Sequence, residues 1–533
     1  MLQPMIRRAR PGLARDITAS VPAPIGGWNV RDPLSAMPQQ DAVVMDNWFP
    51  EAHEVRLRPG CSGYLPTADP GPFTLMPWNG PAGQKLLACI PFGSSTQFLI
   101  GDTSGGTFTA LSGFLTSNDY SYTNFTTSGG HFLVAVNGAE DLQLYNGTTL
   151  QSINSVSVPA ITGVPTNELT FVTQLKRRLW FARKDSSSAW YLPVDAVAGA
   201  AVEFPLGAIF KRGGYLVAMG SWSVDGGDGV DDHSIFISSE GEIAIYTGTD
   251  PSSASDFFLI GLFYVGEPIG RRCLAQFGGD LLYLCRYGVY PLSKALTSST
   301  IDRRQAITDK INVAFASAVA AYGALPGWQV IVYPGGPFVL VNIPIDELAF
   351  TSMQFVMNTL TGAWCRFTGL NAYHWEVFDD LLYSGGIGPG TAGDINGIQL
   401  QWSGVADNDL PIAGNCQQAF NYFGRRGQQK LCKLIRPMLA LDATIGLQLS
   451  LDTDFSVNDF ASTSSLAPPA GFLWDIAVWD VATWSAGARV LRNWASVPAR
   501  EFYAAALRLQ VSSASATVRW TATDFALEVG GIL

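Results

Sequence analysis

The chain has 533 residues, of which 47% are hydrophobic and only 14% are charged, and its net charge is −11. This composition allows a large core and excludes an intrinsically disordered chain. The 55 glycines and 31 prolines indicate frequent turns, so we expect an all-β fold. The acidic balance also argues against non-specific binding to nucleic acid.

Residues 1–65 are predicted to form an extended N-terminal arm, because prolines recur along the segment and no regular periodicity appears. The first 15 residues carry four arginines and no acid, which leaves a charge of −15 on the rest of the chain. We expect the apolar side chains of the arm to lie against its own domain or against a neighbouring subunit. These side chains are Trp28, Leu34, Trp48, Phe49, Val55 and Leu57.

Targeting and redox signals are weak. The N-terminus is basic but lacks the apolar core of a signal peptide. Residues 311–345 contain no charged side chain, but the glycines and prolines of 323–337 exclude a membrane span. The cysteines are odd in number and form no CxxC pair, which indicates buried free thiols in a protein assembled in a reducing cytoplasm. They are Cys61, Cys89, Cys273, Cys285, Cys365, Cys416 and Cys432.

Between residues 66 and 408, a strand pair around a tight turn recurs at roughly 45 to 57 residues, close to the blade period of a β-propeller. A sandwich seldom reuses one motif so often, so we predict a six- or seven-bladed β-propeller with four-stranded blades. The copies include KLLACI (85–90), HFLVAV (131–136), RRLWFA (177–182), HSIFIS (233–238), DLLYLC (280–285) and DLLYSGG (380–386).

The stretch 328–386 is predicted to supply most of one blade as a single antiparallel sheet. WQVIVY (328–333) and FVLVNI (338–343) indicate a hairpin around the turn 334–337. Both faces of this hairpin are apolar, so we expect the sheet to be covered on both faces. Further strands are expected at QFVMN (354–358), at AWCRF (363–367) and on either side of Asp379-Asp380.

One helical insertion is predicted near residues 301–322, between two blades. Seven residues fall on one face of an amphipathic helix that ends at Gly323. They are Ile307, Ile311, Ala314, Phe315, Ala318, Val319 and Tyr322.

Residues 409–533 are predicted to form a separate C-terminal, sandwich-like β-domain, because alternating runs such as ATVRWTAT (516–523) close the chain. The segment 424–437 concentrates five basic residues ahead of a tryptophan-rich region. We favour a role in the sandwich core for the tryptophans over stacking against glycan or single-stranded nucleic acid. They are Trp474, Trp479, Trp484, Trp494 and Trp520.

No catalytic, cofactor-binding or metal-binding residue is predicted. The sequence Gly388-x-Gly390-x-x-Gly393 matches a dinucleotide fingerprint, but Pro389 interrupts it and a strand at 398–402 follows where a helix is needed. The histidines are isolated, and none belongs to an HExxH or nucleophile motif. They are His53, His131, His233 and His374.

The acidic loop 223–234 leaves two alternatives open, a Ca²⁺ site or a solvated loop, of which we favour the loop. Ser223-x-Asp225-x-Gly227 begins like the Asp-box of sialidase-type propellers, but the Thr-Trp that should follow is absent. A sialidase also needs an arginine cluster and a tyrosine nucleophile at the propeller centre, and the sequence identifies neither. The acidic residues of the loop are Asp225, Asp228, Asp231 and Asp232.

Several segments resemble tail proteins of short-tailed bacteriophages and their prophages. The longest is GGWNVRDPLSAMPQQDAVVMDNWFPEAHEVRLRPG (26–60), with a glycine-led start, an NWFP centre and an RxRPG end. In architecture, the chain is similar to the tail nozzle, also called tail tubular protein B, or to the hub. The resemblance continues in AWYLPVDAVAGAA (189–201), FKRGGYLVAMGSWS (210–223), GTDPSS (248–253), GEPIGRRC (266–273), MNTLTGAWCRF (357–367), FGRRGQQK (423–430) and EVGGIL (528–533).

This resemblance implies a structural virion protein, assembled in the host cytoplasm and located in the tail. Members of this family form a hexameric ring below the portal and adaptor, close the DNA-ejection channel, and carry fibres or spikes. DNA is expected to pass through the lumen without sequence-specific binding. The family has no catalytic motif to carry over, so we expect no enzyme activity. The alternative is a glycan-binding propeller or a sialidase-like glycosidase, supported by the partial Asp-box and the tryptophans.

Overall fold

The computed structural model describes residues 15–67, 74–81, 83–92, 95–101, 109–112, 115–225, 230–295, 302–346, 350–390, 395–460, 464–466, 489–490, 493–496 and 500–532. These residues form two compact units, which are described one at a time below. The larger unit contains Pro59–Thr359 and Phe367–Leu410, and the smaller contains Met1–Arg58, Leu360–Arg366 and Pro411–Leu533. None of the described helices is long and apolar enough to cross a membrane.

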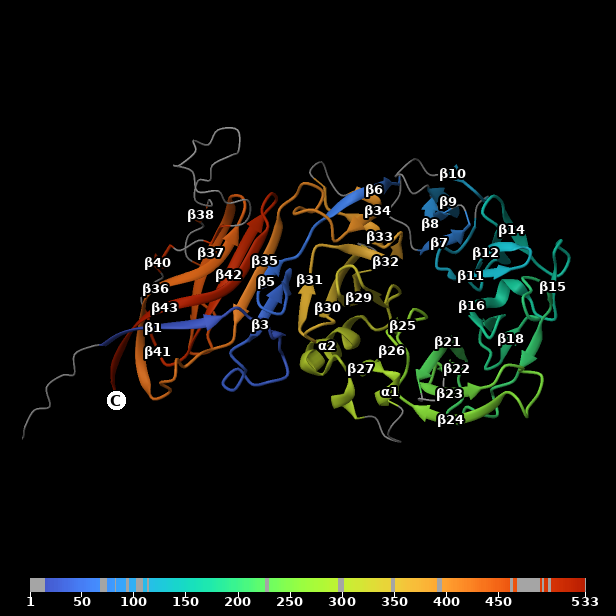
Figure 1. Cartoon of the computed structure of the whole chain (residues 1–533), viewed down its shortest axis with the longest axis horizontal. Coiled ribbons are helices and arrows are strands. Elements are labelled where there is room, and N and C mark those ends of the chain that lie inside the picture. Colours follow the sequence, from blue (N-terminus) through green and yellow to red (C-terminus); the bar gives the residue numbers. More distant parts are fainter. Residues whose placement is uncertain are drawn as a thin grey trace, which may run out of the picture. The chain divides into compact units, whose positions relative to one another are not determined.

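The larger unit is a β-propeller (Figure 1). Five of its sheets have four antiparallel strands. In four of these sheets, the order of the strands across the sheet is the same as their order along the chain. These four are β7 (Thr74–Gly80), β8 (Gly83–Phe92), β9 (Ser95–Gly101) and β10 (Thr109–Ala110); β11 (Ser121–Thr127), β12 (Gly130–Val136), β13 (Leu142–Tyr145) and β14 (Leu150–Ile153); β16 (Leu169–Leu175), β17 (Arg178–Arg183), β18 (Ala189–Tyr191) and β20 (Val202–Phe204); and β21 (Leu216–Asp225), β22 (Val230–Ser238), β23 (Glu242–Thr247) and β24 (Phe258–Tyr264).

The fifth blade joins the two ends of this unit. An early strand of the chain, β6, pairs with β34, so that Ser62 lies opposite Leu400 and Cys61 opposite Gln401. The circle of sheets is therefore closed by a strand that precedes the first blade in sequence. The blade consists of β32 (Asn371–Phe378), β33 (Leu381–Gly388), β34 (Ile395–Gln401) and β6 (Cys61–Pro66).

The prediction of six or seven four-stranded blades is wrong in its count, because the other strands of this unit do not form four-stranded sheets. After β27 the chain enters the short helix α1 (Leu292–Ala295) instead of adding a fourth strand, so β25 (Leu274–Phe277), β26 (Asp280–Cys285) and β27 (Gly288–Pro291) form a three-stranded sheet. The strands β28 (Gln329–Tyr333), β29 (Phe338–Asp346) and β30 (Thr351–Asn358) belong to a ten-stranded sheet.

The stretch 328–386 contains the predicted hairpins but not the predicted single sheet. β28 and β29 pair across the proline–glycine turn, with Val330 opposite Val341. β32 and β33 pair across Asp379 and Asp380, whose φ angles are 50° and 58°, as a tight hairpin turn requires. However, β32 and β33 belong with β34 and β6 in the closing blade. Hydrophobic alternation identified the strands and could not assign them to sheets.

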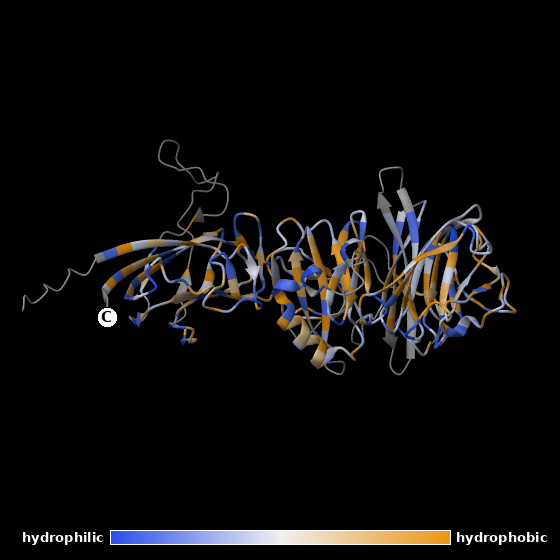
Figure 2. Cartoon of the chain, turned by 90° about the horizontal axis from the view of Figure 1, so that it is seen from below, coloured by the Kyte–Doolittle hydropathy of each residue, from blue (hydrophilic) through white to orange (hydrophobic). Residues whose placement is uncertain are grey.

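Blade faces stack on one another, which explains why the inner strands are apolar on both sides. In β26, Leu282, Tyr283 and Leu284 are all fully buried, although successive side chains point to opposite faces. Figure 2 shows hydrophobic residues recurring along many strands of the chain. Between the third and fourth blades, the Trp180 ring lies 5.5 Å from that of Phe236 and contacts Phe204 and Phe257.

The predicted helical insertion contains α2 (Asn312–Tyr322), which is followed by Gly323. Ile311, Phe315 and Ala318 are buried, in agreement with the predicted apolar face. Three single-turn 3-10 helices lie at Thr166–Glu168, Arg303–Gln305 and Asp309–Ile311. A parallel pair of two-residue strands, β15 (Ile161–Thr162) and β19 (Gly199–Ala200), lies outside the blades.

The smaller unit consists of strands from both ends of the chain together with β31 from its middle, and these strands belong to two sheets. The first contains β1 (Arg15–Pro22), β4 (Trp48–Pro50), β5 (Val55–Leu57), β36 (Gln428–Leu441), β39 (Arg489–Val490), β40 (Ala495–Ser496), β41 (Glu501–Phe502) and β43 (Val518–Ile532). The second contains β2 (Gly27–Trp28), β3 (Asp41–Asp46), β31 (Trp364–Phe367), β35 (Ile412–Gln418), β37 (Ile445–Thr453), β38 (Ser464–Leu466) and β42 (Ala505–Ser513).

This division differs from the predicted separate arm (1–65) and separate C-terminal domain (409–533). β1 pairs with β43 residue by residue, from Arg15 opposite Val529 to Pro22 opposite Ala522. β3 pairs with β35, so the arm supplies strands to both sheets. A proline-rich segment without periodicity is predicted to be extended, but its sequence does not indicate which strands it pairs with. The described part of the arm therefore lies against its own chain.

Contacts join the two sheets of the smaller unit. A Cβ atom built on Gly414 of β35 would lie 2.8 Å from Trp48 Nε1, so only glycine allows the two sheets to approach this closely. A sandwich-like arrangement stays a prediction, which this contact supports. Trp520 is fully buried, as expected for a core residue, whereas Trp494 is partly exposed. Trp474, Trp479 and Trp484 lie outside the described residues.

Candidate functional site

The structure does not gather the four histidines into one site. His53 lies exposed in a turn, His131 in β12, His233 in β22 and His374 in β32. Within the described ranges, no group of three or more His, Cys, Asp or Glu side chains is placed to hold a metal ion. Only His374 reaches the centre of the propeller, where it lines a cavity.

The two loop motifs contribute little to a site. Residues 226–229 of the acidic loop, including Asp228, and Gly393 of the glycine fingerprint lie outside the described residues. β21 and β22 form a hairpin around that acidic loop, and the Ser223 hydroxyl donates a hydrogen bond to the Asp232 carboxylate. β34 follows Gly393 as a strand, where a dinucleotide site would need a helix.

None of the seven cysteines forms a disulfide, and all seven are buried. Burial raises the pKa of Cys273 and of Cys285 to about 12, so both thiols stay protonated at neutral pH. This protonation makes them poor nucleophiles, and the structure places them as core residues.

The strongest candidate site is a cavity of about 370 Å³ at the centre of the propeller. Its walls come from β11, β16, β28 and β32 and from the residues that lead into β25, so five sheets contribute to it. A cavity of this volume matches the lower end of small-molecule sites. Its polar lining includes Asp119, Tyr122, Arg271, Arg272, His374 and Glu376.

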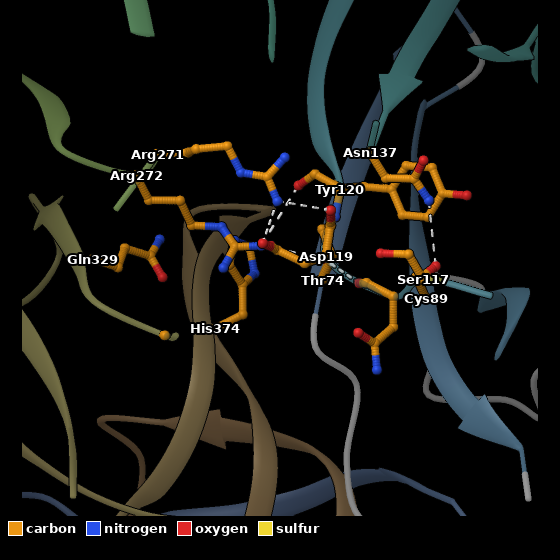
Figure 3. A network of polar contacts seen from close by, with 12 residues as sticks. Thr74, Cys89, Ser117, Asp119, Tyr120, Asn137, Arg271, Arg272, Gln329 and His374 are labelled. Carbon is orange, nitrogen blue, oxygen red and sulfur yellow. Dashed lines mark hydrogen bonds and ion pairs between the residues drawn. The ribbon is translucent and has the colours of Figure 1, made fainter. Parts of the chain in front are cut away.

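Two arginines share one carboxylate in this cavity (Figure 3). Arg272 Nη2 donates to Asp119 Oδ1 at 2.7 Å and to Thr74 Oγ1 at 3.1 Å. Arg271 donates to the same carboxylate and, through Nη1, to the Thr170 carbonyl at 2.8 Å. Burial alone would raise the pKa of Asp119, but the two guanidinium groups outweigh it and hold that pKa below its ordinary value. Asp119 is therefore ionised, and through the two arginines the cluster connects Thr74 of β7 and Thr170 of β16 to the start of β25.

Glu376 and His374 lie two residues apart on β32, so their side chains point to the same face. His374 Nδ1 accepts a hydrogen bond from the Leu75 backbone N–H at 3.1 Å, which places the ring proton on Nε2. Burial lowers the pKa of His374 well below its ordinary value, and the nearby Arg272 lowers it further. The ring is therefore neutral at physiological pH.

Glu376 is the titratable group of the cavity. Burial raises its pKa to about 7, against the opposing effects of the Tyr122 hydroxyl, which hydrogen-bonds to it, the Val377 N–H and the charge of Arg272. Burial and the same carboxylate raise the pKa of Tyr122 well above its ordinary value. A phenol held in its protonated form is a hydrogen-bond donor rather than a nucleophile.

No sequence motif indicates this cavity directly. Its charged residues lie between positions 119 and 376, so no local motif contains them all. Two signals were present: the Arg271-Arg272 pair just before β25, and the spacing of His374 and Glu376 on one face of β32, the first strand of the closing blade. The cavity holds two arginines and a tyrosine–glutamate pair, and both arginines are engaged by Asp119.

A second polar cluster, in the smaller unit, is built from the segment 26–60. Asp46 accepts two hydrogen bonds from Arg366, at 2.6 Å to Nε and 2.9 Å to Nη2. Asn47, at φ 58°, donates to the Ala413 carbonyl and accepts from Arg58 Nε at 2.9 Å. The next residue, Trp48, is fully buried.

The start of the same segment is equally constrained. Gly27 has φ 80°, and a Cβ atom there would lie 2.6 Å from the Trp364 carbonyl oxygen. Asn29 Nδ2 donates to Asp41 at 2.7 Å and to Asp32 at 2.9 Å. The residues of this motif are therefore used to join strands.

Comparisons with known proteins add only a general likeness of fold. No protein-family model and no curated protein matches this sequence. The chain is similar to the β-propeller domain of Cps50 (Swd1) from Myceliophteria thermophila, with 11% identity, a TM-score of 0.37, and coverage of 62% of this chain and 96% of that one. It is also similar to a putative 6-phosphogluconolactonase from Bacteroides fragilis, with 14% identity, a TM-score of 0.35, and coverage of 56% and 86%. A third structure, BBS1N in complex with ARL6DN, shares 10% identity at a TM-score of 0.36, with coverage of 64% and 94%.

Proposed function

We propose that this chain is a structural subunit of the tail of a short-tailed bacteriophage, of the nozzle or hub class. The observation that carries the proposal is the segment 26–60, which resembles these proteins and whose distinctive residues have structural roles. Gly27 allows a close backbone approach, Asp46 holds Arg366, and Trp48 fills the core. Each of these roles is structural, which fits a scaffold subunit.

The proposed assembly is a homo-hexameric ring that contacts the adaptor on one side and fibres or spikes on the other. Its lumen would let DNA pass and would close before ejection. An acidic wall fits this role, because DNA carries about one charge per 1.7 Å and would adhere to a basic wall at many phosphates. Screening limits the repulsion to roughly 8–10 Å, so only wall residues close to the duplex would matter.

The glycosidase alternative has less support. The central cavity contains an arginine pair and a tyrosine–glutamate pair, but Asp119 engages both arginines and the pKa of Tyr122 is raised well above its ordinary value. We therefore expect the purified chain to release no sugar from sialosides or bacterial polysaccharides. Measurable hydrolysis that disappears in Tyr122→Phe would favour the enzyme over the tail subunit.

Mass measurement and imaging of the full-length chain test the proposed ring. We expect particles of six times 57.2 kDa, with a central opening visible in negative-stain images. The opening should be lined mainly by Asp and Glu. A monomer at all concentrations, also in the presence of the other tail proteins from the same genome, would contradict the proposal, and so would a lumen lined mainly by Arg and Lys.

A further inference from the structure

The outer strand of the fourth blade, β24, leaves an apolar sheet edge exposed. It runs from Phe258 to Tyr264 and pairs with β23 on one side, while no other described strand pairs with its outer side (Figure 1). The side chains of Phe258, Leu259 and Ile260 are 50%, 36% and 48% exposed. The run from Phe257 to Val265 contains no charged residue and no proline. An edge of this kind offers its unpaired backbone groups to another strand.

The outer strands of the other four-stranded blades are protected. β10 has only two residues, and β20 has three, of which Glu203 is charged and exposed. In β14 the exposed positions are the polar Gln151 and Ser152, and β6 ends in Pro66. Short strands, charges, polar side chains and prolines are common means by which proteins protect sheet edges, and β24 uses none of these four.

The register of β24 against β23 is interrupted only once. Gly261 lies opposite Ile245 and Leu259 opposite Tyr246, so Ile260 is the extra residue of a β-bulge. A bulge bends a strand locally, but the four residues from Gly261 to Tyr264 stay in regular register with β23. The edge therefore keeps a regular stretch on which another strand can form a ladder.

Charged side chains of opposite sign lie at the two ends of β24. Asp256 precedes the strand and is exposed, and the backbone N–H groups of the preceding loop hold its carboxylate. At the other end, the Arg212 guanidinium lies 3.7 Å from the centre of the Tyr264 ring, and Lys211 is its neighbour in sequence. Both basic residues are exposed, and neither forms an ion pair within the described part of the chain. The edge is therefore acidic at its start and basic at its end.

The acids closest to the basic end do not neutralise it at this edge. Glu242 of β23 is buried and accepts a hydrogen bond from the Arg212 backbone N–H at 2.8 Å. Glu267 pairs with Arg286 at 2.9 Å. Glu267 and Glu240 also line a second cavity of the propeller, of about 700 Å³, whose described lining includes no residue of β24.

We propose that β24 is a docking edge for the β24 strand of a second copy of this chain, with the two strands antiparallel across a two-fold axis. This arrangement places Asp256 of each copy opposite Lys211 and Arg212 of the other, whereas a parallel arrangement would bring like charges together. Pairing satisfies the backbone groups of both edges and covers exposed apolar side chains of both copies. Ile260, midway between Asp256 and Tyr264, then lies near the axis.

The contact stands independently of the proposed ring. A ring whose two faces bind different proteins has no two-fold axis in its plane, so this contact belongs to chains that have not joined such a ring. One strand of seven residues buries less than the roughly 1,200 Å² of typical specific interfaces. We therefore expect a weak dimer, with a Kd on the order of 10 µM.

Sedimentation velocity of the full-length chain from about 1 to about 100 µM tests the proposal. We expect a species of twice 57.2 kDa that grows with concentration. Ile260→Lys places a charge on the edge and should weaken dimerisation about tenfold or more. Val202→Lys is the matched control, because Val202 is 47% exposed on β20, the outer strand of the third blade. This control should dimerise like the unmodified chain.

Cysteine cross-linking tests how the two strands are oriented. All seven native cysteines are buried, so Ile260→Cys adds a thiol at an exposed position. A bismaleimide reagent that spans about 10 Å should link two Ile260→Cys chains across the axis but should not link two Val202→Cys chains. Adding Lys211→Glu should reduce the cross-link, whereas Lys184→Glu, at an exposed lysine of the second cavity, should leave it unchanged.

A chain that stays monomeric up to about 100 µM would overturn the proposal. Equal weakening by Val202→Lys and Ile260→Lys, or a dimer in which Ile260→Cys gives no cross-link, would also overturn it. Oligomers of open-ended size would identify a non-specific edge instead. A hexamer that Ile260→Lys leaves intact, without the cross-link, would support the proposed ring and contradict this contact. The unmodified dimer and the cross-link remain decisive even if Ile260→Lys fails to fold.

Discussion

Two arginine–carboxylate clusters in this chain use the same chemistry in opposite settings. In the smaller unit, Asp46 and Arg366 form a two-point pair, and the Asp46 side chain is only 16% exposed. In the propeller, Asp119 bridges Arg271 and Arg272 at the edge of a cavity and is 44% exposed. The first cluster has balanced charges and is tightly packed, whereas the second has one cation in excess beside open space.

The difference separates a structural pair from a candidate site. A buried pair whose charges balance fixes a strand register, and its loss leaves a charge where water cannot solvate it. A cluster with unequal charges beside a cavity remains partly solvated, so its loss costs little stability but changes what the cavity attracts. Mutation should therefore cost much more stability at the first cluster than at the second.

The largest effect is expected from Arg366→Met, which removes the partner of Asp46. The buried carboxylate would lose both hydrogen bonds, and we expect the smaller unit to lose about 3 to 4 kcal/mol of unfolding free energy. Urea denaturation followed by tryptophan fluorescence measures this loss. Arg31→Met is the matched control, because its pair with Asp32 is exposed and should cost less than about 1 kcal/mol. Equal losses in both variants would show that the Asp46 pair is no more buried than a surface pair.

Glu376→Gln is expected to stabilise the propeller at high pH. The pKa of Glu376 rises from 4.5 in the unfolded chain to about 7 in the folded chain, so the folded state keeps the proton to higher pH. Stability that is present below about pH 4.5 is therefore lost as the pH rises to about 7. At about 1.4 kcal/mol per pKa unit, the variant should gain on the order of 3 kcal/mol at pH 8 and nothing below pH 4.5.

Thermal unfolding of both proteins from pH 4 to pH 9 measures this difference, and the contribution of His374 cancels because both proteins retain it. A constant difference across this range would mean that Glu376 titrates normally and that the cavity is fully solvated.

Gly27→Ala tests whether the motif of the smaller unit is as constrained as its geometry indicates. An added Cβ would meet a left-handed φ and the Trp364 carbonyl oxygen at 2.6 Å, so we expect a loss of about 2 kcal/mol. Gly362→Ala shares the positive φ, with no atom within 4 Å of the added Cβ, and should cost about 1 kcal/mol. Denaturant unfolding compares the two variants. An equal loss of unfolding free energy in both variants would mean that the close approach of Gly27 to the Trp364 carbonyl adds nothing to the cost.

The smallest stability effect is expected from Arg271→Gln. Asp119 keeps Arg272 as a partner and remains partly solvated, so we expect a loss of about 1 kcal/mol. Urea denaturation of the propeller measures the loss. A value as large as that of Arg366→Met would mean that the central cluster is a structural pair and would remove the contrast between the two clusters.

The sequence was sufficient for the local elements of the propeller. Alternation and turn residues located the hairpins around 334–337 and Asp379-Asp380, and the apolar spacing located α2. It was not sufficient for the assignment of strands to sheets, because a period of two identifies a strand but not its neighbours. β6 and β1 were therefore placed in an arm, although one closes the last blade and the other pairs with β43.

The candidate site depends even more on long-range structure. Asp119, Arg271 and Glu376 are each more than 100 residues apart, and only the circular arrangement of blades brings them together. The raised pKa of Glu376 arises from burial, which no spacing of residues along the chain can indicate.

Deleting residues 1–60 is expected to disrupt the smaller unit, because β1 and β3 pair with C-terminal strands.

The most direct test of the proposed role is electron microscopy of phage particles released by a host that carries this gene, labelled with an antibody against the chain. We predict a label on the tail of every particle, below the head, on a ring-shaped element. A chain that is absent from purified particles, or that is present only as a monomer in the surrounding medium, would contradict a structural role in the tail.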